Sequence, residues 1–187
     1  MLPISRPFFI ATSASLRLAL ASCICVLSTG VAVAQPVPVV PGHFEQFKAL
    51  EGEWLGATKE TTGLRVVYHV TSGASAVIET IAPGSQHEMI TVITKDRESV
   101  SLTHYCAIGN QPHMMAPDSD GGKVVAFKFQ SAGNLKSEND MHMREVTYTF
   151  VDKDNLKTIW TTYNGGKPAG NQVFVLKRKK VATHTAH

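Results

Sequence analysis

Hydrophobic and polar residues alternate with a period of two along most of the chain, in short runs separated by turn residues. In one of these runs, Val66, Tyr68 and Val70 fall on the same face of an extended strand. No segment between consecutive runs is long enough for the helical crossover of a parallel sheet, so the pattern predicts an antiparallel meander. Nine strands are predicted, at 53–61, 64–72, 75–82, 86–95, 99–107, 123–131, 142–151, 156–163 and 171–179.

The residues between these runs are typical of tight turns. Asp118-Ser119-Asp120-Gly121-Gly122 and Asn164-Gly165-Gly166 supply residue types that tolerate positive φ. A meander in which each strand has one apolar face buries those faces by curling shut, and closure leaves no exposed sheet edge. We therefore predict an all-β fold, an antiparallel barrel of about 8–10 strands.

One short helical turn is predicted before the first strand. Phe44, Phe47 and Leu50 are three residues apart, which places them on one face of a helix that stops at Gly52.

The first 34 residues have the pattern of a secretory signal. Arg6 and Arg17 precede an apolar run at 18–27, and Ala32-Val33-Ala34 matches the small-x-small cleavage pattern. We expect cleavage after Ala34 and a mature protein in the periplasm or outside the cell, with no membrane attachment.

Two other interpretations of this segment stay open. Residues 18–34 are at the short limit for a retained transmembrane anchor. Leu20-Ala21-Ser22-Cys23 resembles a lipobox, which would make Cys23 a lipoprotein processing site.

Composition places the rest of the chain in one globular domain. Of the 187 residues, 43% are hydrophobic and 18% are charged, and the mean hydropathy is -0.02, which excludes disordered and multi-pass membrane proteins. Residues 35–42 contain three prolines and are interpreted as a linker. The barrel is expected at 43–180, followed by a polar tail at 181–187.

Cleavage changes both the charge and the cysteine count. Arg6 and Arg17 would leave, which lowers the formal net charge of +3 by two. The basic cluster Lys177-Arg178-Lys179-Lys180 ends the last predicted strand, where a solvated strand end explains it better than a nucleic-acid partner. Cys23 and Cys25 would also leave, so Cys106 has no intramolecular disulfide partner.

The start of the first strand resembles a known family signature. Leu50-Glu51-Gly52-Glu53-Trp54 is similar to the Gly-x-Trp motif of the calycin superfamily, which includes lipocalins and fatty-acid-binding-type barrels. The resemblance implies that Trp54 packs over the closed end of the barrel. It also implies that a basic residue of the last strand, Arg178 or else Lys177, lies across the Trp54 ring.

Further stretches resemble an uncharacterised group of exported bacterial calycin-like domains. That resemblance implies a fold and no activity, and the chain lacks the later Thr-Asp-Tyr loop motif and the disulfide of true lipocalins. The stretches are 71–76, 83–89, 102–106 and 109–112.

Candidate site residues gather at the end of one predicted strand and at the start of another. Alternation places His104 and Cys106 on the inward face, with Asn110 and Gln111 near the rim of the barrel. The same argument, applied to a second strand, turns two more polar side chains inward. These are His142 and Arg144.

Other classes of site fit the spacing less well. His104 and Cys106 are at i, i+2 and could touch as a nucleophile pair, but no oxyanion loop or orienting carboxylate is evident. No metal site is expected, because the histidines lack i, i+3 or i, i+4 pairing and one mature cysteine remains. Packing is the other explanation for each residue, since buried histidines and free cysteines are common in cores.

The sequence therefore favours binding over catalysis. We expect an exported barrel that holds a small apolar or amphipathic molecule in its lumen, without a required cofactor. The first alternative is a haem-binding barrel that uses His104 or His142 as an inward ligand. The second is a structural or interaction domain with a filled core. The sequence does not indicate an oligomeric state.

Overall fold

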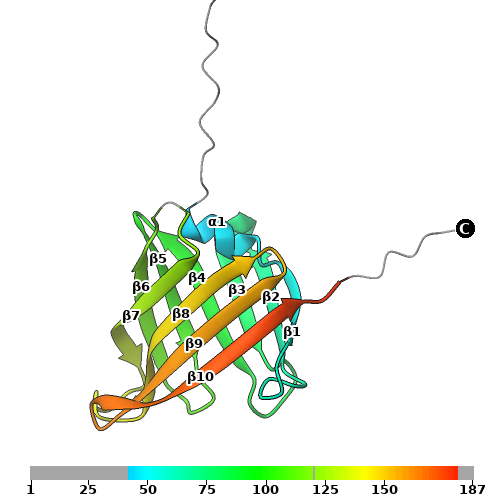
Figure 1. Cartoon of the computed structure of the whole chain (residues 1–187). Coiled ribbons are helices and arrows are strands. Elements are labelled where there is room, and N and C mark those ends of the chain that lie inside the picture. Colours follow the sequence, from blue (N-terminus) through cyan, green and yellow to red (C-terminus); the bar gives the residue numbers. More distant parts are fainter. Residues whose placement is uncertain (1–41, 120, 181–187) are drawn as a thin grey trace, which may run out of the picture. The chain divides into compact units, whose positions relative to one another are not determined.

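The computed structural model describes residues 42–119 and 121–180. Its body is a closed barrel of antiparallel strands, with one short helix at the N-terminal side (Figure 1). The expected signal peptide, residues 35–41 of the expected linker and the polar tail lie outside the described residues. Within the described residues, no helix has the length and apolar character needed to cross a membrane.

The barrel is a meander in which each strand pairs with its neighbours in sequence, and β1 pairs with β10 to close it. The predicted all-β class and the antiparallel closed barrel are confirmed. The elements, in order, are α1 (His43–Lys48), β1 (Gly52–Gly56), β2 (Arg65–Thr71), the 3-10 turn η1 (Ser72–Ala74), β3 (Ala76–Ile81), β4 (Met89–Asp96), β5 (Ser99–Tyr105), β6 (Gln111–Pro117), β7 (Val124–Gly133), β8 (His142–Asp152), β9 (Asn155–Asn164) and β10 (Lys167–Arg178).

The ten strands fall within the predicted 8–10, but one of them is absent from the nine predicted ranges. Residues 111–117 form a strand that the sequence pattern did not indicate. The first strand is also shorter than predicted and ends at Gly56. A Cβ atom at Gly56 would lie 1.7 Å from the carbonyl oxygen of Thr61, so the returning chain passes directly over this glycine. Only glycine permits that approach.

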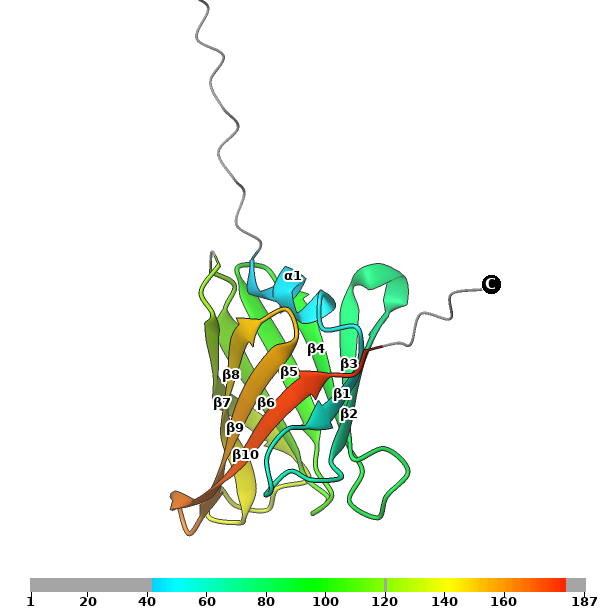
Figure 2. The ribbon, with the colours of Figure 1, turned by 45° about the vertical axis from the view of Figure 1, so that its right-hand side comes forward.

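The helix α1 covers one end of the barrel, which we call the α1 end (Figures 1 and 2). Phe44, Phe47 and Leu50 are buried, in agreement with the predicted helical face. The Phe47 ring makes edge contacts with Tyr148 and Phe150, at centroid distances of 5.0 and 5.3 Å. These contacts fill the α1 end with apolar side chains.

The opposite end, which we call the loop end, is formed by the connections at 106–110, 134–141 and 165–166. These connections are hydrogen-bonded to one another: the Asn134 side chain donates to the Gly109 carbonyl at 2.7 Å, and the Gly165 amide donates to the Asn139 carbonyl at 2.7 Å. The connections of the loop end are therefore held together by polar hydrogen bonds, whereas apolar side chains fill the α1 end.

Candidate functional site

Four inward residues on neighbouring strands form a continuous polar row inside the barrel. In the strand registers, Tyr68 is paired with Glu79, Glu79 with Thr91, and Thr91 with His104. Each of the four is at most 1% exposed. A row of this kind interrupts an otherwise apolar core, and buried polar groups persist only when they are hydrogen-bonded.

Glu79 is the centre of this row. The Tyr68 hydroxyl donates to Glu79 Oε1 at 2.6 Å and the Tyr148 hydroxyl donates to Oε2 at 3.0 Å. Burial raises the pKa of Glu79 above its usual value, although hydrogen bonds from both tyrosines and Thr91 act in the opposite direction. None of the ion pairs among the described residues includes Glu79.

His104 lies at the end of the row. Its Nδ1 is 2.9 Å from the Thr91 hydroxyl, and its ring centroid is 4.4 Å from that of Trp160. Burial lowers the pKa of His104 to about 4, so the imidazole is neutral at pH 7. The Thr91 hydroxyl can donate to His104 Nδ1 or accept from it, so this contact is compatible with either neutral tautomer of the ring.

This arrangement leaves the second ring nitrogen of His104 free. His104 Nε2 is buried and has no hydrogen-bond partner in the part of the chain that the structure describes. On β9, Thr158 Oγ1 and the indole donor Trp160 Nε1 are also buried without a partner there. The lumen therefore contains hydrogen-bonding capacity that its own residues do not use.

A second polar group lies at the loop end. Asn110 is 6% exposed and donates from Nδ2 to the Met141 carbonyl at 2.8 Å. His142 is fully buried, and its Nδ1 lies 2.7 Å from the Asp140 carbonyl. Since a carbonyl oxygen only accepts, these contacts make His142 Nε2 and Asn110 Oδ1 the acceptor atoms, and neither has a partner among the described residues.

Arg144 differs from its predicted inward position. The register of β8 against β9 shifts between Met143 and Glu145, which breaks the alternation on which that prediction depended. The guanidinium group lies 4.6 Å from the Phe129 ring centroid and 5.5 Å from that of Tyr163. It also pairs with Glu138 at 3.0 Å, and its side chain is 30% exposed. The Arg144 charge is therefore paired with Glu138 and stacked on aromatic rings, so it is not available to a ligand in the lumen.

Cys106 lies in the turn after β5 and not on the predicted inward face, whereas Gln111 begins β6 at the loop end. Cys106 follows the last residue of β5 and is half-buried in the turn, where its amide donates to the Asn110 carbonyl at 3.1 Å. Gln111 lies between the buried residues Asn110 and Pro112, and its side chain donates to the Gly109 carbonyl at 2.9 Å. Both side chains belong to the turn, so the predicted set reduces to His104, Asn110 and His142.

The three residues connected with the family signature lie together at the α1 end. The Arg178 guanidinium lies 4.3 Å from the Trp54 ring centroid, and Arg178 donates to the carbonyls of Ala49 and Glu51, both at 2.7 Å. Gly52 has a φ of +119° and lies under Arg178 Nη1, so a side chain there would be strained. This arrangement fixes α1 to the closing seam between β1 and β10.

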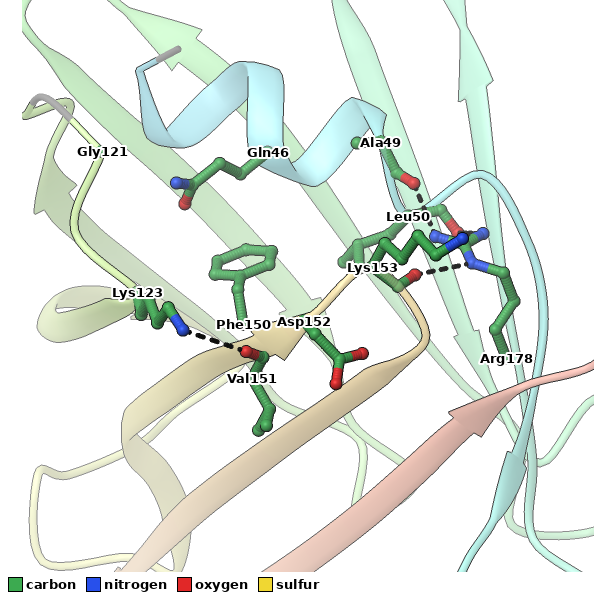
Figure 3. A pocket seen from close by; sticks show the side chains of 10 residues that line it. All are labelled: Gln46, Ala49, Leu50, Gly121, Lys123, Phe150, Val151, Asp152, Lys153 and Arg178. Atoms are coloured by element: carbon green, nitrogen blue, oxygen red, sulfur yellow. Dashed lines mark hydrogen bonds between the residues drawn. The ribbon is translucent and has the colours of Figure 1, made fainter. Parts of the chain in front are cut away.

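A surface pocket of about 410 Å³ lies between α1 and the turn after β8. Figure 3 shows the Gln46 side chain beside the Phe150 ring, with Lys123 directed to the Val151 carbonyl. The pocket has an apolar floor and one buried polar atom without a partner, Gln46 Oε1. It lies at the opposite end of the barrel from the predicted ligand-binding residues, and no sequence pattern indicates it.

Sequence reasoning missed most of the lumenal row. A signal was present in the run 76–81, because alternation with Val77 and Ile81 places Glu79 on the inward face. An acidic residue on an inward apolar face requires buried donors. The identity of those donors, Tyr68 and Tyr148, depends on strand register, which the sequence pattern does not give. Among the described residues no group of three metal-ligating side chains is present.

Comparisons with known proteins support the fold alone. No protein-family model matches the chain, and no curated protein matches it. The crystal structure of Rv2717c from M. tuberculosis is similar, with a TM-score of 0.53 and 17% sequence identity over 77% of this chain and 99% of that one. The chain is thus a closed ten-strand antiparallel barrel that has a solved structural neighbour of the same fold.

Proposed function

We propose that this protein is an exported, calycin-like barrel that binds a small amphipathic molecule through its loop end. The observation that carries the proposal is the pair of buried imidazoles, His104 and His142, each with one nitrogen held by the protein and the other without a partner. Leaving such atoms unpaired is costly, and a bound molecule removes that cost.

The chemistry of the free atoms indicates the kind of ligand. His142 Nε2 and Asn110 Oδ1 at the loop end are both acceptors, whereas Trp160 Nε1 is a donor. At the loop end the free atoms favour a ligand whose polar group donates hydrogen bonds, such as a hydroxyl, an amide or an amine. Met89 and Met143, which pack against the core and are partly buried, supply adaptable apolar contacts.

Native mass spectrometry of protein purified from its own host tests this proposal. The unmodified protein should carry a non-covalent adduct of constant mass, and H142F and H104F should lose it. H113F is a matched control, because His113 is half-buried on β6 and its Nδ1 contacts Thr103 on the adjacent strand. A bare mass in every preparation, or an adduct that H142F retains, would contradict the proposal.

A filled, structural barrel is the second candidate, and the central aromatic layer favours it. Trp54, Tyr68, Tyr148 and Trp160 are each at most 1% exposed and occupy much of the interior. This candidate predicts that ordered water satisfies the free atoms. It also predicts a bare mass for the protein and for all three variants.

Haem is the alternative ligand that the same atoms permit. A neutral imidazole with a free Nε2 is the form that binds iron, and both buried histidines have an Nε2 without a partner among the described residues. Each ring has an aromatic neighbour, Trp160 beside His104 at 4.4 Å and Phe129 beside His142 at 5.0 Å. The position of His142 at the loop end therefore makes it the better candidate. Added hemin should then produce a Soret shift that H142A abolishes, and an unchanged spectrum removes this alternative.

A further inference from the structure

Eleven outward residues on four consecutive strands, β3 to β6, form a patch without Lys, Arg, Asp or Glu. We call this patch the neutral face. The registers place these residues side by side, since Ile78 is paired with Val92, Val92 with Thr103 and Thr103 with His113. On β4 the first charged residues are Lys95 and Asp96, at the α1 end. The neutral face consists of Ile78, Thr80, Ile90, Val92, Thr94, Ser101, Thr103, Tyr105, Gln111, His113 and Met115.

The other six strands each place a charge on the outer face. Ion pairs border the neutral face on both sides, with Arg65 and Glu53 3.8 Å apart beyond β3, and Lys128 and Glu145 2.9 Å apart beyond β6. The charged outward residues of the six strands are Glu53, Arg65, Lys128, Glu145, Lys157 and Lys177.

Large apolar side chains are exposed at the loop end of the neutral face. Tyr105 is 50% exposed and its cross-strand partner Ile90 is 37% exposed. Ile108, in the turn that follows β5, is 49% exposed. Low charge around an exposed aromatic residue is the composition of the central part of a protein–protein interface.

We propose that the neutral face binds the neutral face of a second copy of this chain across a two-fold axis. In a two-fold contact each patch meets itself, so any charge on it would face a like charge. The neutral face avoids that repulsion because it has no Lys, Arg, Asp or Glu. For the same reason it has no charge that would attract a charged partner. Each of β3 to β6 is paired with a strand on both sides, so contact between side chains is the available mode on the neutral face.

The size of the neutral face sets the expected strength of the dimer. Four strands about 4.8 Å apart, with about three outward residues each, give a patch of about 400 Å² on each copy. A two-fold contact would then bury about 800 Å² in total, which corresponds to weak and reversible association. The dimer should therefore depend on protein concentration.

Sedimentation velocity of the purified protein, from about 5 to about 500 µM, tests the proposal. The weight-average sedimentation coefficient should rise from the monomer value toward the dimer value and change little with added salt. Y105K and V92K should each raise the dissociation constant at least about tenfold, because each places like charges in contact across the axis.

V173K is the matched control, because Val173 is 42% exposed on β10, on the far side of the strand order from β4 and β5. It should associate like the unmodified protein, and far-UV circular dichroism should show that all three variants are folded. Monomer at every concentration would overturn the proposal. Equal association of Y105K, V92K and the unmodified protein would also overturn it.

Discussion

His104 makes the stability of the barrel depend on pH. The neutral ring packs against Trp160 and contacts Thr91, and burial lowers its pKa to about 4 from an ordinary value of 6.5. Because the folded-state pKa is the lower one, the contribution of His104 is fully present above pH 6.5 and is lost as the pH falls toward 4. At its limit this loss is about 3 kcal/mol.

Comparison with H104Q tests this dependence. Between pH 7 and pH 4.5, the unfolding free energy of the unmodified protein should fall by about 2 kcal/mol more than that of H104Q, which cannot be protonated. Urea denaturation at the two pH values measures the difference. Equal losses would show that His104 does not govern the acid response.

Glu79 should give the unfolding free energy the opposite pH dependence to that of His104. Burial raises its pKa in the folded state, so its contribution is fully present below the unfolded pKa and is lost as the pH rises through the folded value. E79Q keeps an oxygen acceptor for Tyr68 or Tyr148 and cannot ionise. It should gain stability relative to the unmodified protein between pH 4.5 and pH 8, as measured by urea denaturation. A stability difference that does not vary with pH would contradict the assignment.

At the scale of elements, Arg178 fixes α1 to the barrel seam. It donates to the carbonyls of Ala49 and Glu51 and covers the Trp54 ring. R178K keeps the charge but loses the planar fork, so it should reduce the unfolding free energy by about 1 to 3 kcal/mol. Thermal and urea unfolding measure the change. K177R, at an exposed neighbouring position, is the control and should change stability little.

The missed strand β6 shows where sequence patterning is insufficient. Its inward residues are Pro112, Met114 and Ala116, and its outward residues include His113 and Met115. Few of these residues are β-branched or aromatic, and a proline is typical of strand ends. Pairing with β5 and β7 on both sides holds this segment in the sheet. Such tertiary pairing outweighs local propensity and is invisible in a single run of residues.

The register shift in β8 also limited what the sequence pattern could predict about the candidate site. Period-two alternation correctly buried Val146 and Tyr148, but the register shift between Met143 and Glu145 redirected Arg144 to the rim. His142, on the far side of the shift, is buried. Alternation therefore predicts inward residues only as far as the first bulge.

At the scale of the whole molecule, the meander and its closure could be predicted because turn residues and alternation agree along the chain. The lumenal network could not, because Tyr148 reaches Glu79 from a strand 69 residues away in sequence, although Tyr68 lies on the strand next to Glu79. Only the registers around the barrel bring them together. The α1 end and the loop end likewise became distinct once α1 was placed over one of them.

Export of the whole molecule depends on cleavage of the predicted signal peptide. If the signal is cleaved after Ala34, the exported protein begins at Gln35, and its intact mass will correspond to residues 35–187. Intact mass spectrometry of protein recovered from outside the cytoplasm measures this directly. A lipid-modified mass beginning at Cys23 would instead support lipoprotein processing.

A crystal structure at atomic resolution, of protein purified from its own host, tests ligand binding in the lumen most directly. The account predicts electron density for a bound organic molecule, with a donor atom within about 3.2 Å of His142 Nε2 or His104 Nε2. Density for isolated water molecules alone at both nitrogens would contradict it.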